Sequence, residues 1–167
     1  MLLARARLLA DIRQFFLQRD VLEVETPLLA QAAVTDPNLQ LFKCEGRFLQ
    51  TSPEYAMKRL LADGVGAIYQ VAKAFRLEEM GSRHNPEFTL LEWYQPGYSA
   101  RQLMAEVLEL LQQVLGPLEC QYFSYQQLFQ KFVGLDALTA SKEQLLECLH
   151  ASLELDFEPE DRDTCLD

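Results

Sequence analysis

The segment FRLEEMGSRHNPEFTLLEWY, residues 75–94, holds the side chains best suited to do chemistry. Its charged residues and its histidine are Arg76, Glu78, Glu79, Arg83, His84, Glu87 and Glu92. Arg76 and Glu78 stand two residues apart at the expected end of a strand, so their side chains point to the same face. A second strand is expected over residues 87–94. If the two strands pair in antiparallel fashion, the even-numbered side chains from Phe88 to Tyr94 share one face.

That shared face has a mixed chemical character. Glu92 would lie there between apolar neighbours, and a carboxylate in such a place needs a partner or a polar ligand. A guanidinium, an aromatic ring and a carboxylate in sequence suit a ligand that is anionic, flat and cationic in turn, such as an adenosine phosphate joined to a basic amine. Ordinary explanations remain open for single residues: Arg76 in a surface ion pair, Phe88 and Tyr94 in the core, and His84 in a turn.

The composition is that of a globular domain and excludes several classes of protein. The chain has 167 residues and a net charge of −10, which argues against sequence-independent binding to nucleic acid or to an anionic membrane. It has four cysteines without a C-x-x-C pair and only two histidines, which argues against a zinc site. The first twenty residues are too charged for a signal peptide or a membrane span, so a cytoplasmic protein with reduced thiols is expected.

The expected elements form one α+β domain over residues 1–167. An amphipathic helix fills the first twenty residues, and a short strand follows over 21–25. A hairpin is expected over 39–50 with its turn at Glu45-Gly46, and a helix begins with Ser52 as N-cap and stops near residue 64. Strands over 67–75 and 87–94 come next. Three later helices should begin with capping boxes at Ser99, Ser124 and Ser141, each followed three residues later by glutamine.

Three stretches of the sequence resemble a known family. Residues 75–94 resemble motif 2 of the class II aminoacyl-tRNA synthetases, in particular the lysine-specific branch. FFLQRDVLEVETPLL resembles motif 1 (about 13–29), and TSPEYAMKRLL resembles the substrate-binding helix of that branch. QAAVTDPNLQLF and EEMGSRHNPEFTLLEWYQPGYS are most similar to the shorter paralogues that ligate lysine onto elongation factor P. The implied fold is an antiparallel sheet flanked by helices, present here in part.

The resemblance implies a role for each matched residue. Arg76 would be catalytic, gripping the α-phosphate of ATP and the substrate carboxylate where charge develops. The implied ATP-binding residues are Arg76, Glu78, His84, Asn85 and Phe88, with the Phe88 ring stacked on adenine. The implied substrate-binding residues are Ser52, Glu54, Glu92 and Tyr94, with Glu54 taking the amino group. Compensation of the helix dipole is the competing explanation for Glu54.

The resemblance also implies an activity and a set of partners. Lysine or β-lysine would be activated with ATP as an adenylate and transferred to a lysine of elongation factor P. Magnesium is expected on the ATP phosphates, and no metal ligand is expected from the protein. A homodimer is expected because motif 1 helices usually pair across a two-fold axis. Neither tRNA nor a membrane is an expected partner.

Two departures from the family pattern qualify these expectations. Motif 3, a Gly-rich element that ends in Gly-x-Asp-Arg, is not found before Asp167. The chain is therefore expected to be the N-terminal portion of a catalytic domain, with weak or absent adenylation on its own. Asp20 stands where the family usually has glycine, although aspartate tolerates a left-handed backbone better than most residues. A catalytic fragment of a lysyl-tRNA synthetase and a non-catalytic dimerisation module remain as alternatives.

Overall fold

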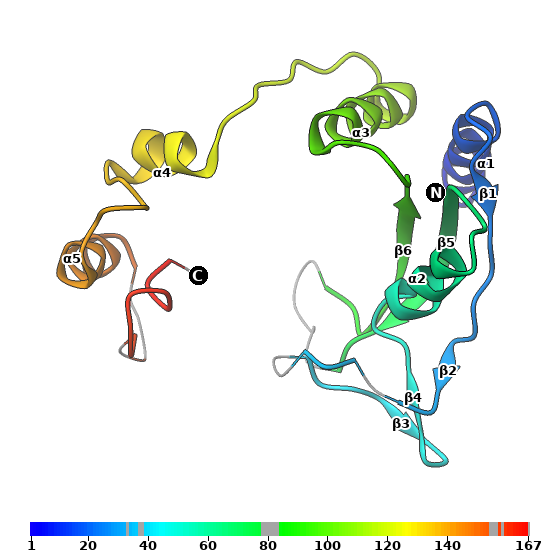
Figure 1. Cartoon of the computed structure of the whole chain (residues 1–167), viewed down its shortest axis with the longest axis horizontal. Coiled ribbons are helices and arrows are strands. Elements are labelled where there is room, and N and C mark those ends of the chain that lie inside the picture. The colour runs from blue at the N-terminus through cyan, green and yellow to red at the C-terminus, as the bar shows by residue number, and fades with distance from the viewer. Residues whose placement is uncertain (33, 37–38, 78–83, 154–156, 158, 167) are drawn as a thin grey trace. The chain divides into compact units, whose positions relative to one another are not determined.

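The chain divides into two compact units, Met1–Leu118 and Glu119–Asp167. The computed structural model describes residues 1–32, 34–36, 39–77, 84–153, 157 and 159–166 (Figure 1). Five helices and six strands lie in this described part, and both sheets are largely antiparallel, which confirms the predicted α+β class. The single catalytic domain expected over residues 1–167 stays a prediction.

Two long strands form the centre of the main sheet in the first unit. β5 (Ile68–Phe75) and β6 (Glu87–Tyr94) are antiparallel, with Ile68 opposite Tyr94 and Phe75 opposite Glu87. β1 (Leu22–Glu23) adds to β5 in parallel. This register confirms the prediction that the even-numbered side chains of β6 share a face, which we call the even face of the sheet.

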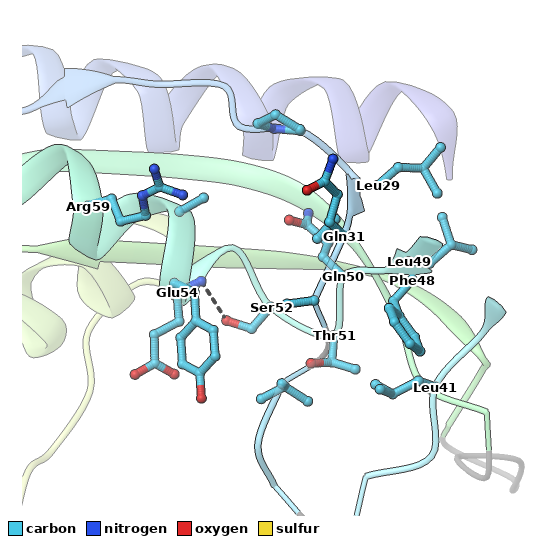
Figure 2. A pocket seen from close by; sticks show the side chains of 16 residues that line it. Leu29, Gln31, Leu41, Phe48, Leu49, Gln50, Thr51, Ser52, Glu54 and Arg59 are labelled. Atoms are coloured by element: carbon cyan, nitrogen blue, oxygen red, sulfur yellow. Dashed lines mark hydrogen bonds between the residues drawn. The ribbon is translucent and has the colours of Figure 1, made fainter. Parts of the chain in front are cut away.

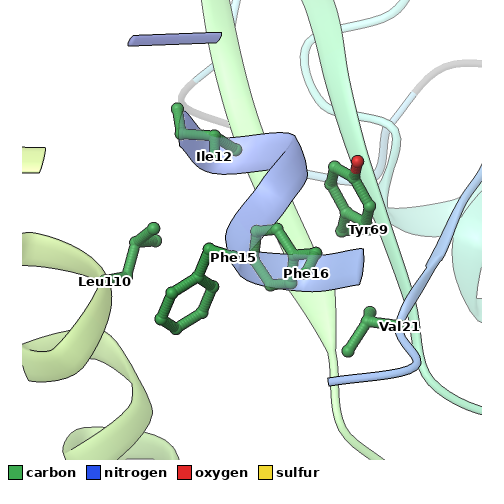
Figure 3. Packing of buried hydrophobic residues seen from close by; sticks show 6 residues of the cluster. All are labelled: Ile12, Phe15, Phe16, Val21, Tyr69 and Leu110. Atoms are coloured by element: carbon green, nitrogen blue, oxygen red, sulfur yellow. The ribbon is translucent and has the colours of Figure 1, made fainter. Parts of the chain in front are cut away.

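The main core covers the opposite, odd-numbered face. It lies against α1 (Leu2–Leu17) and α3 (Ala100–Leu115), as Figure 3 shows for the buried cluster Ile12, Phe15, Phe16, Val21, Tyr69 and Leu110. The Phe16 ring stacks on the Tyr69 ring with centroids 4.3 Å apart, and it lies 5.6 Å from the Trp93 ring. Because both helices pack on this side, the even face does not form part of this core.

A buried carboxylate fastens α3 to the end of β6. Glu106 is 4% exposed, and its two oxygens accept hydrogen bonds from Trp93 Nε1 at 2.9 Å and Gln95 Nε2 at 2.7 Å. A buried carboxylate is tolerated when its hydrogen-bonding capacity is used in this way. Glu106 therefore fixes the register of the helix on the strand.

Tyr69 makes the stability of the first unit depend on pH in the alkaline range. Burial and a 2.9 Å hydrogen bond from its hydroxyl to Glu23 Oε2 raise the pKa of Tyr69 to about 12. A phenol that keeps its proton more tightly when folded stabilises the fold below its unfolded pKa of about 10, and that stabilisation is lost as the pH rises from about 10 to about 12. The free energy of unfolding is therefore expected to fall across this window.

Tyr69→Phe should make that fall shallower, because the substituted ring has no proton to lose. Urea unfolding at a series of pH values, followed by the fluorescence of Trp93, the chain's single tryptophan, measures it. An identical slope in the wild type and in Tyr69→Phe would contradict the assignment.

The turn after α1 depends on a residue in the left-handed region. Asp20 has φ 55°. This conformation costs an ordinary L-residue about 1–2 kcal/mol, and aspartate is among the residues that enter it most readily. The helix end therefore forms with aspartate in the position where the resemblance leads one to expect glycine.

Asp20→Gly is expected to raise the free energy of unfolding of the first unit by about 0.5–1 kcal/mol, because glycine adopts positive φ without a steric penalty. Asp20→Ala should lower it. Both changes can be measured by urea unfolding followed at Trp93. A Gly variant no more stable than the Ala variant would show that the turn is not strained.

A smaller antiparallel sheet leads the chain into α2 (Glu54–Ala62). Its order is β2 (Leu29–Ala30), β4 (Arg47–Leu49) and β3 (Lys43–Cys44). Glu45 and Gly46 have φ of 47° and 73°, the positive values of a two-residue hairpin turn, which confirms the predicted turn.

Several predicted boundaries differ from those in the structure. The first helix, expected over the first twenty residues, ends at Leu17. Strand 21–25 is confined to Leu22–Glu23 and the hairpin to 43–49, and isolated hydrogen bonds continue beyond those points, such as the one from Val24 N to Tyr69 O. Gln50, for example, bonds to Leu28 O through its backbone N and to Lys73 O through its side chain. The N-cap of α2 is Pro53 rather than Ser52, although the Ser52 hydroxyl still accepts from Glu54 N at 3.1 Å.

The second unit contains α4 (Tyr125–Val133) and α5 (Lys142–Ser152). Capping boxes begin α3, α4 and α5 at Ser99, Ser124 and Ser141, as predicted. The small core of the second unit contains Ala140, Leu145 and Cys165. Among the described residues, no helix is both long enough and apolar enough to cross a lipid bilayer.

Candidate functional site

The even face of β5 and β6 positions the predicted arginine and phenylalanine together. Phe88 lies opposite Ala74 in the ladder, and Arg76 follows β5 two residues later. The guanidinium carbon of Arg76 lies 5.2 Å from the centroid of the Phe88 ring, within the range of a cation–π contact. Arg76 Nε also donates to Thr51 O at 3.4 Å. A planar cation and an aromatic ring thus stand side by side at one end of this face.

Glu92 lies farther along the same face and is held by two hydroxyl groups. Its Oε2 accepts a hydrogen bond from Ser52 Oγ at 2.6 Å, and its Oε1 accepts one from the Tyr94 hydroxyl, also at 2.6 Å. Burial, this hydrogen bond and the charge of Glu92 raise the pKa of Tyr94, which keeps the phenol protonated as a donor at neutral pH. Both donors are neutral hydroxyl groups, so neither brings a positive charge to the carboxylate.

Ser52 joins this network to the start of α2. The same hydroxyl that donates to Glu92 accepts from Glu54 N, so the first residue of the helix is placed beside the sheet. The Glu54 carboxylate accepts from Lys58 Nζ at 2.5 Å. Hydrogen bonding to Glu54, the charge of Glu54 and the charge of Glu92 raise the pKa of Lys58. The negative charges of Glu54 and Glu92 therefore both favour a cation at the position of Lys58, which suits an ammonium group.

A cavity of about 600 Å³ lies beside the Ser52–Glu54 turn. Figure 2 shows its apolar end formed by side chains from the small sheet and from the segment between β2 and β3, with Glu54 and Arg59 of α2 at the opposite end. Its apolar lining includes Leu29, Leu41, Phe48 and Leu49. Of the predicted site residues, Ser52 and Glu54 line this cavity. Phe88, Glu92 and Tyr94 belong to β6, and Arg76 directly follows β5. Sequence reasoning missed the cavity because its walls come from residues dispersed between 27 and 59.

The remaining predicted residues are at the loop between the two long strands. His84 and Asn85 are exposed and come just before β6. They lie near the Arg76 end of the sheet, because Arg76 N donates to Pro86 O at 2.9 Å. Their contacts with phosphate stay predictions, and Glu78 lies outside the described residues.

The groups on this face could bind an anion, a flat ring and an amine. Arg76 and Phe88 offer a guanidinium for a phosphate and a ring for a base. Glu54 and Glu92 offer charge for an ammonium group. In the described part of the chain, no group of three or more histidine, cysteine, aspartate or glutamate residues lies close enough together to hold a metal ion.

Comparison with known proteins shows the family of this chain. The family model described as tRNA synthetases class II (D, K and N) matches residues 1–157. A protein of Haemophilus influenzae (strain PittGG) named elongation factor P–(R)-β-lysine ligase is 49% identical over 175 residues, covering 99% of this chain and 54% of the relative. A protein of the same name from Salmonella paratyphi B is 50% identical over 182 residues, with 99% and 54% covered.

This chain thus spans about half the length of the curated relatives it matches. The matched half contains both strands of the even face and the start of α2, so the described site lies inside the shared region. The family model covers nearly all of the chain, and the chain belongs to the class II tRNA synthetase family of the D, K and N type.

Proposed function

We propose that this chain supplies one wall of the active site of an ATP-dependent ligase. The ligase activates lysine or β-lysine as an adenylate and transfers it to a lysine of elongation factor P. One observation carries the proposal: a cation–π pair, Arg76 and Phe88, shares a face with a hydrogen-bonded carboxylate, Glu92. The names of relatives about 50% identical support the choice of substrates.

The first step needs positioning and charge stabilisation. A carboxylate oxygen of the amino acid attacks the α-phosphorus of ATP, and the bond to the leaving pyrophosphate breaks. Arg76 would donate two parallel N–H bonds to the α-phosphate and the attacking carboxylate, where negative charge is concentrated. Phe88 would stack on the adenine and fix the direction of the phosphates. His84, Asn85 and Glu78 would complete the ATP site.

The amine end of the substrate would be held by carboxylates. Glu54 would bind the amino group, with Ser52 fixing the turn that carries it. Glu92, held by Ser52 and Tyr94, would lie beside it. The transfer step then follows: the acceptor amine attacks the acyl carbon, the bond to the AMP oxygen breaks, an amide forms and one proton leaves. Neither step of this scheme requires a described residue to form a covalent bond to the substrate.

The proposal includes several properties of the whole ligase. Magnesium would accompany the ATP phosphates. Two copies would pair through the motif 1 segment. The protein would act in the cytoplasm on a protein acceptor, so tRNA would not be a substrate.

Mass spectrometry of the acceptor tests the proposal. A polypeptide spanning the full length of the relatives, incubated with ATP, β-lysine and elongation factor P, should add one β-lysyl group to the factor. Tyr94→Phe should leave the KM for ATP unchanged and raise the KM for the amino acid by about three- to tenfold, because Glu92 loses one of its two donors. Charging of tRNA in place of elongation factor P would contradict the proposal and favour a lysyl-tRNA synthetase.

A further inference from the structure

The amine end of the candidate site already contains a cation. Lys58 lies one helical turn after Glu54 on α2, and its Nζ is 2.5 Å from Glu54 Oε1. A glutamate four residues before a lysine is the favourable orientation for such a pair on a helix. The ammonium group therefore occupies one side of the carboxylate that the proposed substrate amine would use.

The second carboxylate also acts on this lysine. The charge of Glu92 contributes to the raised pKa of Lys58, so the ammonium lies within the field of both acids. The hydroxyls of Ser52 and Tyr94 hold Glu92 without neutralising it. Lys58 thus supplies positive charge to the place where an incoming ammonium group would otherwise find two negative ones.

The pair can open at little cost. The side chain of Lys58 is 56% exposed and that of Glu54 is 44% exposed, and ion pairs this exposed contribute little to stability. A flexible lysine side chain can move into water when another cation takes its place. The geometry therefore allows exchange between the internal ammonium group and one that enters from solvent.

We propose that Lys58 is a competing internal cation that sets the affinity of the site for its amine substrate. In the unliganded protein it pairs with Glu54, and the substrate ammonium displaces it on binding. This role rests on the proposed function for the identity of the amine. The residues proposed above to bind the amine strengthen substrate binding. Lys58, in contrast, weakens it and neutralises the charge of Glu54 between turnovers.

Lys58→Met tests the inference, because methionine keeps the length and helix propensity of lysine without its charge. In a polypeptide spanning the full length of the relatives, the KM for lysine in ATP–pyrophosphate exchange should fall about two- to fivefold, the fold-change that corresponds to an exposed pair. The kcat and the KM for ATP should stay within about twofold. Direct binding of L-lysine without ATP, measured by calorimetry, should tighten by the same factor.

Lys73→Met is the matched control. Lys73 pairs with Glu87 at 2.9 Å, and the two side chains are 48% and 55% exposed, but the pair lies on the odd-numbered face. This variant should lose similar stability and leave lysine affinity unchanged. A higher KM for lysine in Lys58→Met would overturn the inference and make Lys58 an orienting partner of Glu54. An unchanged KM for lysine would also overturn the inference. If wild type and variants all lack lysine-dependent exchange, the proposed function fails, and the competing role fails with it.

Discussion

Arg76→Ala is expected to lower kcat/KM for lysine-dependent ATP–pyrophosphate exchange by about 10²–10³-fold, the usual effect of removing one donor that stabilises a transition-state charge. Arg76 stands beside Phe88 at the end of the even face, where the α-phosphate would lie if adenine stacks on the ring. The assay needs a polypeptide that spans the full length of the relatives. Binding of ATP alone should weaken much less than the rate, because the negative charge is greatest in the transition state.

Two further substitutions make the test specific. Arg76→Lys keeps the charge but loses the planar fork, and it should still lower the rate at least about tenfold. Arg101→Ala removes an exposed arginine at the start of α3, on a helix that packs against the odd-numbered face, and should leave the rate within about twofold. Equal losses in Arg76→Ala and Arg101→Ala would contradict a direct role for Arg76.

Phe16→Ala is expected to have the largest effect on stability, lowering the free energy of unfolding of the first unit by about 3–5 kcal/mol. Phe16 is fully buried, stacks on Tyr69 and contacts the Trp93 ring, so its removal leaves a cavity between α1 and the sheet. This loss is a large share of the stability of an ordinary domain. Urea unfolding followed by Trp93 fluorescence measures it directly, because the reporter packs against the same cluster.

Leu17→Ala provides the control on the same helix. Leu17 is the next residue, but it is 70% exposed, so truncation should cost less than about 0.5 kcal/mol. A Phe16→Ala variant that unfolds at the same urea concentration as Leu17→Ala would contradict the packing of α1 on β5 and β6.

The long elements could be predicted from sequence because their signals are local. The β6 boundaries, the antiparallel pairing with β5 and the three capping boxes follow from alternation and from Ser-x-x-Gln spacing. The short strands of the small sheet were overestimated, since their ends depend on distant partners. Gln50, for example, is the residue after β4, and its backbone N donates to Leu28 O, the residue before β2.

The site was predictable only in part, for the same reason. Period-two alternation places Glu92 and Phe88 on one face, but nothing in the spacing shows that Ser52, 40 residues earlier, donates to Glu92. The roles of Ser52 and Glu54 came from the family resemblance. The Glu54–Lys58 pair had a visible signal in its four-residue spacing, yet the link from Glu54 through the Ser52 hydroxyl to Glu92 appears only in the folded chain.

The most direct test of the central claim is a crystal structure of the full-length polypeptide with a non-hydrolysable sulfamoyl analogue of β-lysyl adenylate. The shared face of Arg76, Phe88 and Glu92 predicts adenine stacked on Phe88, the sulfamoyl group at Arg76 and the amines beside Glu54 and Glu92. An analogue bound entirely among the apolar residues of the cavity near Phe48, with no contact to Arg76 or Phe88, would contradict the account.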